Sequence, residues 1–352
     1  MNDIVNRIKL RTQTIILMLL LCFALTSCGK EEQVEKKDDT IVFSYGGENI
    51  TVGEAYIYYL TVKENYEALY GDEVWTMSIA TAEDAGVSVS ALLREAVIDE
   101  IVRVKTLVAH AKDYDVELTD ADTKILEEQA REFYNGLTDD DIGRMEISEE
   151  IIAKVMTECS MAKSVEDALL AAEPIEVSLE KARMTTFYDL YFNCYETNNS
   201  GDIIPLSEEN KKKQYENAVD ACGLLTTATI ENDEESEIRV EDVATLYKLE
   251  MSGEYTYSPE QIKKTYGEDI CQMLYSMENG EHSTVVETEY GYHVFKMIAL
   301  TDEDATMSKK AQMTNDLINE RLGTVIEEWR LQIDKEFKYP DSINMDAYDA
   351  IG

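Results

Sequence analysis

Histidine is rare in this chain, and one of its three copies lies in a pattern that suits a functional site. Turn residues at 279–283, a short strand at 285–288 and a second turn at Gly291 predict a β-hairpin. The alternation along 291–297 places His293 on one face with Phe295 and Met297. Because an imidazole on an apolar strand face is more often a hydrogen-bonded core residue, the residue type leaves both a structural and a functional role open. Three histidines exclude a histidine-rich metal site.

The elements around this hairpin predict a mixed unit of strands and helices. Residues 184–192 are β-branched and aromatic, which favours a strand, and helical patterns follow at 207–223 and 241–252. Ser258, Pro259 and Gln261 have the order of an N-cap, first turn and capping residue of another helix. Strand, helices and two further strands over about 120 residues indicate an α+β fold.

The chain before this unit reads as helical, and nothing in it looks catalytic. Residues 41–47 predict a strand and turn, and Thr51 with Glu54 predicts a capping box that opens a helix. An amphipathic stripe spans 90–112. Further helices are expected from Thr119, over 148–172 and over 307–333, the last followed by a polar tail that contains Pro340.

The hairpin residues also carry a family resemblance. Gly280, Ser283, Thr288 and the Gly-Tyr-His triplet at 291–293 fall at the spacing seen in parvulin-type peptidyl-prolyl isomerases. The order of helical segment, parvulin-like unit and terminal helix resembles the SurA and PrsA class of extracytoplasmic foldases. This resemblance implies a helical, trigger-factor-like chaperone domain that is completed by a C-terminal helix, with an inserted parvulin-like domain of antiparallel sheet and helices.

The resemblance also implies a division of the chain. We expect a lipoprotein signal peptide over 1–27 and a lipidated flexible tether over 28–40. The first part of the helical chaperone domain should span 41–180 and the parvulin-like domain 181–301. Residues 302–352 should form a C-terminal helix and tail that pack on the helical domain.

Prolyl isomerisation sets specific demands on such a domain. The X-Pro bond rotates over a barrier of about 20 kcal/mol, because the transition state loses amide resonance. An enzyme lowers this barrier by holding the proline ring in an apolar pocket and by stabilising the twisted amide, so no nucleophile, metal or cofactor is needed. Parvulins resemble one another in a pair of histidines on neighbouring strands, a Cys or Asp that faces the amide, and a Met and Phe in the pocket.

Carried over to this chain, the family's site is incomplete. His293 matches the second histidine, while Tyr188 or Asp189 stands where the first belongs. The pocket positions fall on Tyr266 and Ile270, and we add Phe295 to the pocket. Residues 252–257 occupy the place of the family's glycine-rich stretch. We therefore expect a foldase or chaperone that is nominally a prolyl isomerase, with weak or no activity; the alternative is a non-enzymatic chaperone or scaffold lipoprotein.

The first residues have the parts of a secretory signal. Arg7, Lys9 and Arg11 precede an apolar stretch over 15–25 that is short for a bilayer span. It ends in Leu-Thr-Ser-Cys, which resembles the bacterial lipobox and implies a lipid on Cys28. An uncleaved membrane anchor is the alternative, which the short apolar stretch disfavours. We expect an extracytoplasmic protein, held on the membrane of a bacterial envelope by its lipid.

The net charge limits the classes of partner, and the cysteine spacing bears on whether disulfides form. The chain has 72 Asp and Glu against 32 Lys and Arg, and removal of residues 1–27, with three basic residues and one acid, leaves a formal charge of −42. Such a surface repels nucleic acid. The resemblance to extracytoplasmic foldases implies unfolded or secreted protein clients as partners. Four cysteines remain outside the leader and its lipobox, and their spacing leaves disulfides and free thiols equally open. They are Cys159, Cys194, Cys222 and Cys271.

Overall fold

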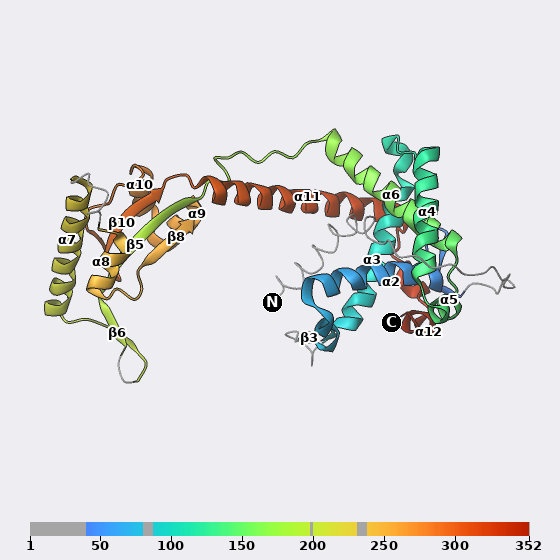
Figure 1. Ribbon diagram of the computed structural model, residues 1–352, viewed down its shortest axis with the longest axis horizontal. Helices are drawn as coiled ribbons and strands as arrows, with labels where there is room; N and C mark the ends of the chain where they lie inside the picture. Colours follow the sequence, from blue (N-terminus) through green and yellow to red (C-terminus); the bar gives the residue numbers. More distant parts are fainter. Residues whose placement is uncertain (1–39, 80–86, 198–199, 231–237, 352) are drawn as a thin grey trace. The chain divides into compact units, whose positions relative to one another are not determined.

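The computed structural model describes residues 40–79, 87–197, 200–230 and 238–351. The expected signal peptide, Cys28 and the tether lie outside these residues. The chain separates into two compact units, one built from residues up to Ile175 and from Leu317 onward, the other from Glu176–Asp316 (Figure 1). Helix α11 (Glu303–Ile333) contributes residues to both. Among the described helices, none has the length and apolar character needed to span a membrane.

The first unit is mainly helical. It opens with an antiparallel hairpin of β1 (Ile41–Tyr45) and β2 (Glu48–Thr51), which turns at Gly46 and Gly47 with positive φ. Short elements follow: η2 (Asp72–Thr76), β3 (Ser78–Ile79), β4 (Val87–Ser88) and η3 (Ala111–Tyr114). The helices are α2 (Val52–Tyr70), α3 (Val89–Ala109), α4 (Asp120–Gly136), α5 (Asp139–Met145) and α6 (Glu149–Ala172).

Local capping starts these helices, with one difference from the expectation. Thr51 caps α2 by accepting a hydrogen bond from the Glu54 N–H, but the Glu54 carboxylate is buried and pairs with Lys105 instead of closing the capping box. Thr119 and Asp122 do form a complete capping box at α4. A buried ion pair between helices thus replaces a local contact at the start of α2.

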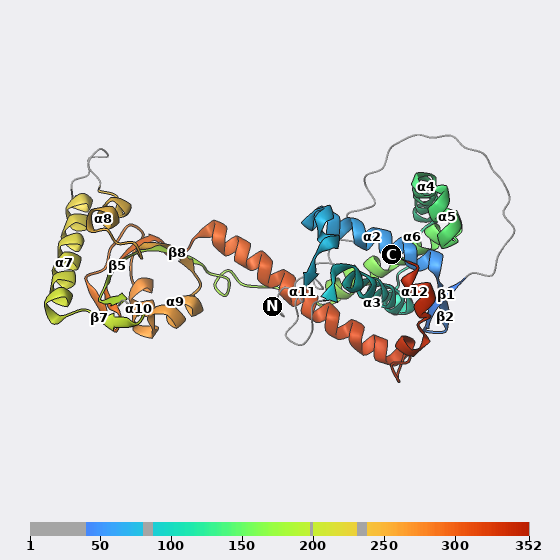
Figure 2. The same cartoon turned by 90° about the horizontal axis from the view of Figure 1, so that it is seen from below.

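The C-terminal segment packs onto the first hairpin. After α11 the chain forms η4 (Tyr339–Ser342) and α12 (Met345–Asp349), and Figure 2 shows α12 beside β1. The Asn344 N–H donates to the Val42 carbonyl over 2.7 Å. Tyr339 and Ile351 are buried, and their apolar surface holds the otherwise polar tail on the unit.

The second unit is built on a four-stranded antiparallel sheet in the order β8-β5-β10-β9. These strands are β8 (Gly253–Tyr257), β5 (Thr185–Asn193), β10 (Gly291–Ala299) and β9 (Val286–Thr288). The helices are α7 (Glu208–Ile230), α8 (Val240–Tyr247), α9 (Pro259–Tyr266) and α10 (Glu268–Tyr275). A small hairpin joins β6 (Tyr195–Thr197) to β7 (Ile203–Pro205). The expected α+β class is confirmed.

Strand alternation gives the sheet two apolar faces. Leu190 and Val294 pack with α7 and α8, whereas Phe187, Phe295 and Met297 pack with α9 and α10. The predicted faces of the last strand are therefore correct, and the sheet lies between two helical layers (Figure 1). Because both faces are covered, six successive residues of β5, from Thr185 to Leu190, are buried, whichever face they are on.

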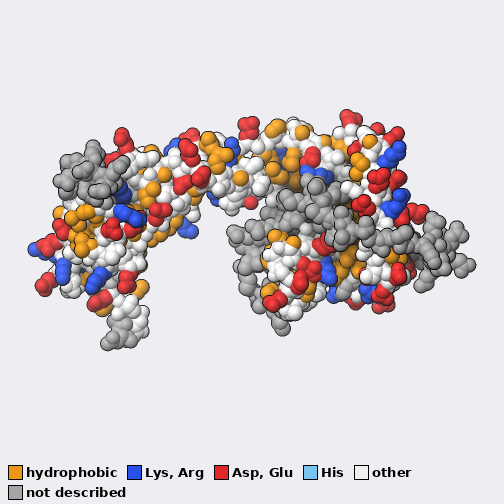
Figure 3. Space-filling view, in the orientation of Figure 1, with side chains coloured by type: hydrophobic (Ala, Val, Ile, Leu, Met, Phe, Trp, Pro, Cys, Tyr) orange, Lys and Arg blue, Asp and Glu red, His pale blue; other side chains and the backbone are white. Residues whose placement is uncertain are grey.

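Two predictions for this unit differ from the structure. The helix expected over 241–252 ends at Tyr247, because Lys248 adopts a left-handed conformation with φ of 55°. Residues 253–257 then form the edge strand β8, hydrogen-bonded to β5. The four cysteines that were left open are free thiols. Figure 3 shows acidic side chains spread over the visible face of each unit, in line with the excess of acidic residues.

Candidate active site

The two central strands of the sheet bring Asp189 and His293 into contact. The register pairs His293 with Tyr191 and Phe295 with Asp189, so Asp189 is a diagonal neighbour of His293 on the same face. The His293 Nδ1 lies 2.9 Å and 3.0 Å from the two oxygens of the Asp189 carboxyl group. Only 3% of Asp189 and 6% of His293 is exposed. An ionised carboxylate only accepts hydrogen bonds, so this geometry places a proton on Nδ1.

The second imidazole nitrogen is also engaged. The His293 Nε2 lies 3.1 Å from the Thr288 Oγ1 across the β9–β10 turn. The same hydroxyl lies 3.1 Å from the Gly291 carbonyl and accepts from the Tyr290 N–H. Both nitrogens therefore have protein partners. A substrate amide could reach either one only by displacing Asp189 or Thr288.

Aromatic rings enclose the imidazole. The Tyr191 ring stacks on His293 with centroids 4.6 Å apart, and Phe295 lies parallel to it at 5.5 Å. The Tyr266 ring meets Phe295 edge-on at 5.3 Å, and the Tyr266 hydroxyl donates to the Asp189 Oδ2 over 3.1 Å. Burial, and then the charge of Asp189, raise the pKa of Tyr266 well above its usual range, so its hydroxyl remains a donor.

The sequence-predicted residues fall into three groups. His293, Asp189, Tyr266 and Phe295 are brought together. Ile270 lies on α10 in the same apolar cluster as Phe295, and Phe295 is fully buried, so both act as core residues in this structure. Tyr188 lies on the other face of the sheet, packed in the cluster with α7 and α8. One position along a strand reverses the side-chain direction, which separates Tyr188 from the site.

The remaining motif residues shape the backbone. A Cβ on Gly291 would lie 2.3 Å from the Phe192 carbonyl oxygen, and its φ of 157° is rare for other residues. The Ser283 hydroxyl accepts from the Phe295 N–H over 2.9 Å, and the Gly280 N–H donates to the Met297 carbonyl. The family spacing therefore reflects how the preceding loop is hydrogen-bonded along β10.

Two contacts of His293 were missed in the sequence. Thr288 belonged to the motif but received no role, although its position across a tight turn from His293 signals proximity. Tyr191 alternates with Asp189 on β5, so it shares the site's face. Both follow from pairing β5 and β9 with β10, which the sequence pattern alone did not specify.

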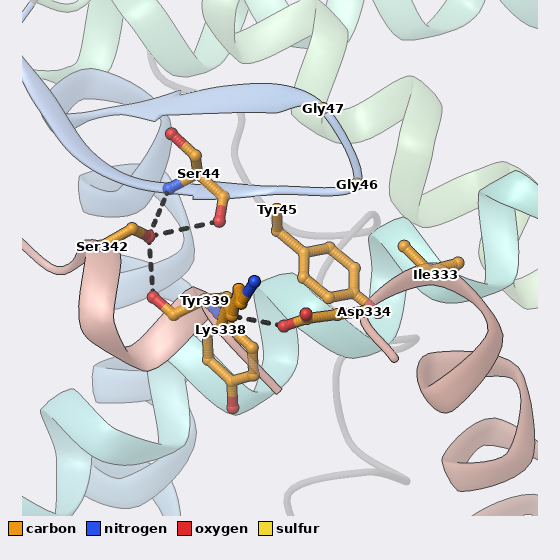
Figure 4. A pocket seen from close by; sticks show the side chains of 9 residues that line it. All are labelled: Ser44, Tyr45, Gly46, Gly47, Ile333, Asp334, Lys338, Tyr339 and Ser342. Atoms are coloured by element: carbon orange, nitrogen blue, oxygen red, sulfur yellow. Dashed lines mark hydrogen bonds between the residues drawn. The ribbon is translucent and has the colours of Figure 1, made fainter. Parts of the chain in front are cut away.

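Other concave and ligand-like features are limited. Among the described residues, no cluster of three or more His, Cys, Asp or Glu side chains could hold a metal ion. An open cavity of about 540 Å³ lies in the helical unit between the β1–β2 turn and the end of α11 (Figure 4). Its polar groups are used internally: the Ser342 Oγ accepts from the Ser44 N–H, and Asp334 accepts from the Tyr339 N–H. The cavity therefore lies at the contact between the C-terminal segment and the β1–β2 hairpin.

Most of the second unit matches a known domain family. Residues 203–299 match the sequence model of the PPIC-type PPIASE domain, also described as rotamase. The matched range starts after β5, so it contains His293 but not Asp189. By fold and motif, the second unit is a parvulin-type domain.

The whole chain is PrsA-like. It is 23% identical to the foldase protein PrsA of Caldanaerobacter subterraneus over 351 residues, which cover 94% of this chain and 98% of that protein. Solved structures of PrsA from Bacillus cereus and Bacillus anthracis are similar at 16% and 13% identity, with TM-scores of 0.26 and 0.25. They match 79% and 68% of this chain, and 99% and 97% of their own. The domain match and the likeness to the Caldanaerobacter protein confirm the resemblance to PrsA-type foldases.

Proposed function

We propose that this chain is a lipid-anchored extracytoplasmic foldase or chaperone for secreted proteins, whose parvulin-type domain has weak or no prolyl isomerase activity. Likeness to PrsA over nearly the whole chain supports the foldase role. The basic residues 7–11, the apolar stretch 15–25 and Cys28 support secretion and lipid attachment.

The Asp189–His293 pair carries the proposal of weak activity. Of the two candidates for the position of the first family histidine we choose Asp189, because it shares a face with His293 whereas Tyr188 packs on the opposite face. The carboxylate holds the His293 Nδ1 while Thr288 holds Nε2. Catalysis requires groups that bind the twisted amide better than the planar one. An imidazole with both nitrogens occupied and rings on both sides is poorly placed for that task.

The expected proline pocket supports the same proposal. Tyr266 stands at the position of the family's pocket methionine, and its ring packs edge-on against both Phe295 and Phe187. Its hydroxyl is tied to Asp189. A rigid, hydrogen-bonded tyrosine takes up space that a flexible methionine would yield to a proline ring.

The remaining domains then carry the binding function. We assign chaperone activity to residues 41–180 with 302–352, and a binding role to the parvulin-type residues 181–301. A second candidate is a scaffold lipoprotein that binds one folded partner and no unfolded clients. The enclosed His293 is compatible with both the chaperone and the scaffold, so an assay with an unfolded client must distinguish these two functions.

The test compares catalysis with client protection in the mature chain, residues 28–352. We expect no acceleration of isomerisation of a short X-Pro peptide beyond its spontaneous relaxation of tens to hundreds of seconds, in wild type and His293→Ala alike. The same chain should delay aggregation of insulin reduced with dithiothreitol. Fast isomerisation that is lost in His293→Ala would overturn the weak-activity proposal, and no delay of aggregation would favour the scaffold.

A further inference from the structure

An exposed apolar patch borders the candidate site beyond the end of β5. It consists of Tyr195, Ile203, Pro205 and Tyr290, and we call it the Tyr290 patch. Ile203 is 74% and Tyr290 60% exposed. Tyr195 pairs with Pro205 and Thr197 with Ile203, and paired residues of antiparallel strands share a face. The Tyr195 and Tyr290 rings lie 6.0 Å apart, which joins the hairpin to the β9–β10 turn.

Hydrogen bonds hold this patch in place and connect it to His293. The Tyr195 hydroxyl donates to the Glu289 carbonyl over 3.3 Å, and the Tyr191 hydroxyl donates to the Tyr290 carbonyl over 3.0 Å. Tyr191 is also the ring that stacks on His293. The patch is therefore a preformed continuation of the candidate site, and its order lowers the entropic cost of binding.

The surroundings of the patch are acidic. Glu196, Glu287 and Glu289 are exposed, and none of them forms an ion pair with any residue that the structure describes. Two lysines of α7, the helix that follows this hairpin, are already paired with acidic residues. Lys211 pairs with Glu208 at 2.9 Å and Lys212 with Glu216 at 3.7 Å, and Lys213 follows them in sequence. Glu289 directly precedes Tyr290 and lies next to the exposed rings, whereas Glu196 is on the opposite face of the hairpin and Glu287 shares a face with Tyr292. The acidic surroundings as a whole attract a cationic partner.

We propose that the Tyr290 patch binds extended, unfolded chain segments in which a Lys or Arg stands beside aliphatic or aromatic residues. This inference rests on the foldase function proposed above and names the class of client. Aliphatic side chains would cover Ile203 and Tyr195, while the cation would lie near the Tyr290 ring and the carboxylates. Acidic segments should be rejected, because like charges would meet at the rim.

The test uses two proline-free, fluorescein-labelled peptides of twelve residues. One alternates Lys with Leu and Tyr, and the other has Glu in place of Lys; the absence of proline keeps the isomerase pocket out of the measurement. By fluorescence anisotropy, we expect the mature chain, residues 28–352, to bind the basic peptide at least about tenfold more tightly than the acidic one. The preference should shrink as salt rises.

Variants locate the binding. Ile203→Ser with Tyr290→Ser should weaken binding of the basic peptide about tenfold, since two exposed anchors are lost. Leu246→Ser is the matched control, because Leu246 is 65% exposed on α8 and outside the patch. Glu196→Gln with Glu287→Gln and Glu289→Gln should reduce both the affinity and its salt dependence. Circular dichroism checks that each variant is folded.

The outcomes separate this inference from the foldase proposal. Equal binding of the two peptides, or equal losses in the patch and Leu246 variants, would overturn the assignment of the patch. The insulin aggregation assay judges the foldase role independently. If wild type and the patch variant delay aggregation equally, only the client site inferred here is wrong.

Discussion

The Lys105 ammonium on α3 lies 2.8 Å from the Glu54 carboxylate on α2, with 6% and 3% of the two side chains exposed. Glu158 on α6 is 2.7 Å from the same ammonium. Burial would lower the pKa of Lys105, but hydrogen bonds to Glu158 and Glu54 outweigh it and raise the pKa. One cation thus joins three helices of the unit.

Loss of this cation should destabilise the helical unit. Lys105→Met takes the buried ammonium from Glu54 and Glu158, which then share only the more exposed Lys154, and we expect a loss of about 3 kcal/mol in the free energy of unfolding. The control Lys63→Met removes an exposed pair with Glu67 and should cost about 0–1 kcal/mol. Urea unfolding followed by tryptophan fluorescence measures both, because Trp75 and Trp329 belong to this unit. Equal effects would contradict the structural role of Lys105.

A second buried group predicts pH-dependent stability. Burial raises the pKa of the Glu100 carboxyl to about 7, against the lowering effect of Arg103, while the Glu166 charge adds to the rise. The folded state then binds more protons than the unfolded state between about pH 4.5 and pH 7. Stability should therefore fall as the pH rises through this window, by roughly 3 kcal/mol.

The variant Glu100→Gln isolates this effect. It should flatten the pH dependence of the urea midpoint between pH 4.5 and pH 7.5, since the titrating carboxyl is gone. Glu127→Gln, on the exposed side of α4, should leave the dependence unchanged. If the two variants have the same pH profile, the titration belongs to other groups. Glu158, whose carboxyl pKa is also raised by burial, is the first to examine.

The turn into β10 should not tolerate a side chain at its glycine. Gly291→Ala would bring a methyl group against the Phe192 carbonyl, and we expect a loss of roughly 3 kcal/mol in the parvulin-type unit. Gly136→Ala at the end of α4 meets nothing and should be neutral or slightly stabilising. Hydrogen exchange of β5 and β10 amides reports on this unit. Unchanged exchange in Gly291→Ala would refute the close approach.

The proposal of an altered site can be tested by reversing its differences from the family pattern. Asp189→His combined with Tyr266→Met restores a histidine pair and the pocket methionine implied by the resemblance. We expect prolyl isomerisation to rise at least about tenfold above wild type, with client protection unaltered. Tyr266→Phe alone removes only the hydroxyl bond to Asp189 and should cost about 1 kcal/mol of stability without activating the domain. Activation by Tyr266→Phe would point to the hydroxyl as the block.

Lipid attachment has a direct readout. Cells that express the chain and receive radiolabelled palmitate should incorporate label into the wild type. Cys28→Ala should remain unlabelled and keep its leader, because lipobox processing requires the cysteine thiol. Label in the Cys28→Ala variant would show that the lipid is attached elsewhere.

Local patterns predicted much of this structure. Apolar alternation placed His293 with Phe295 and Met297, and the caps at Thr51, Thr119 and Ser258 marked where helices begin. These features depend on neighbours within a few residues, so the sequence specifies them directly. The positions of the strands at 184–192 and 291–297 follow for the same reason.

Contacts between distant segments were not predictable in this way. Tyr266 reaches Asp189 across 77 residues, and Glu54 meets Lys105 on another helix. The edge strand β8 has only five residues and begins with Gly253 and Glu254, which are weak strand formers, so its conformation depends on pairing with β5. Side-chain direction also decided between Tyr188 and Asp189, which required the register of the sheet.

The clamp between Asn344 and Val42 constrains the order in which the chain acquires structure during synthesis. Because β1 is held by residues around Asn344, the helical unit stays incomplete until that segment has left the ribosome. The parvulin-type unit needs nothing beyond Asp316, so it is complete earlier. During synthesis, the parvulin-type unit can therefore fold while the helical unit still lacks the segment that packs on β1.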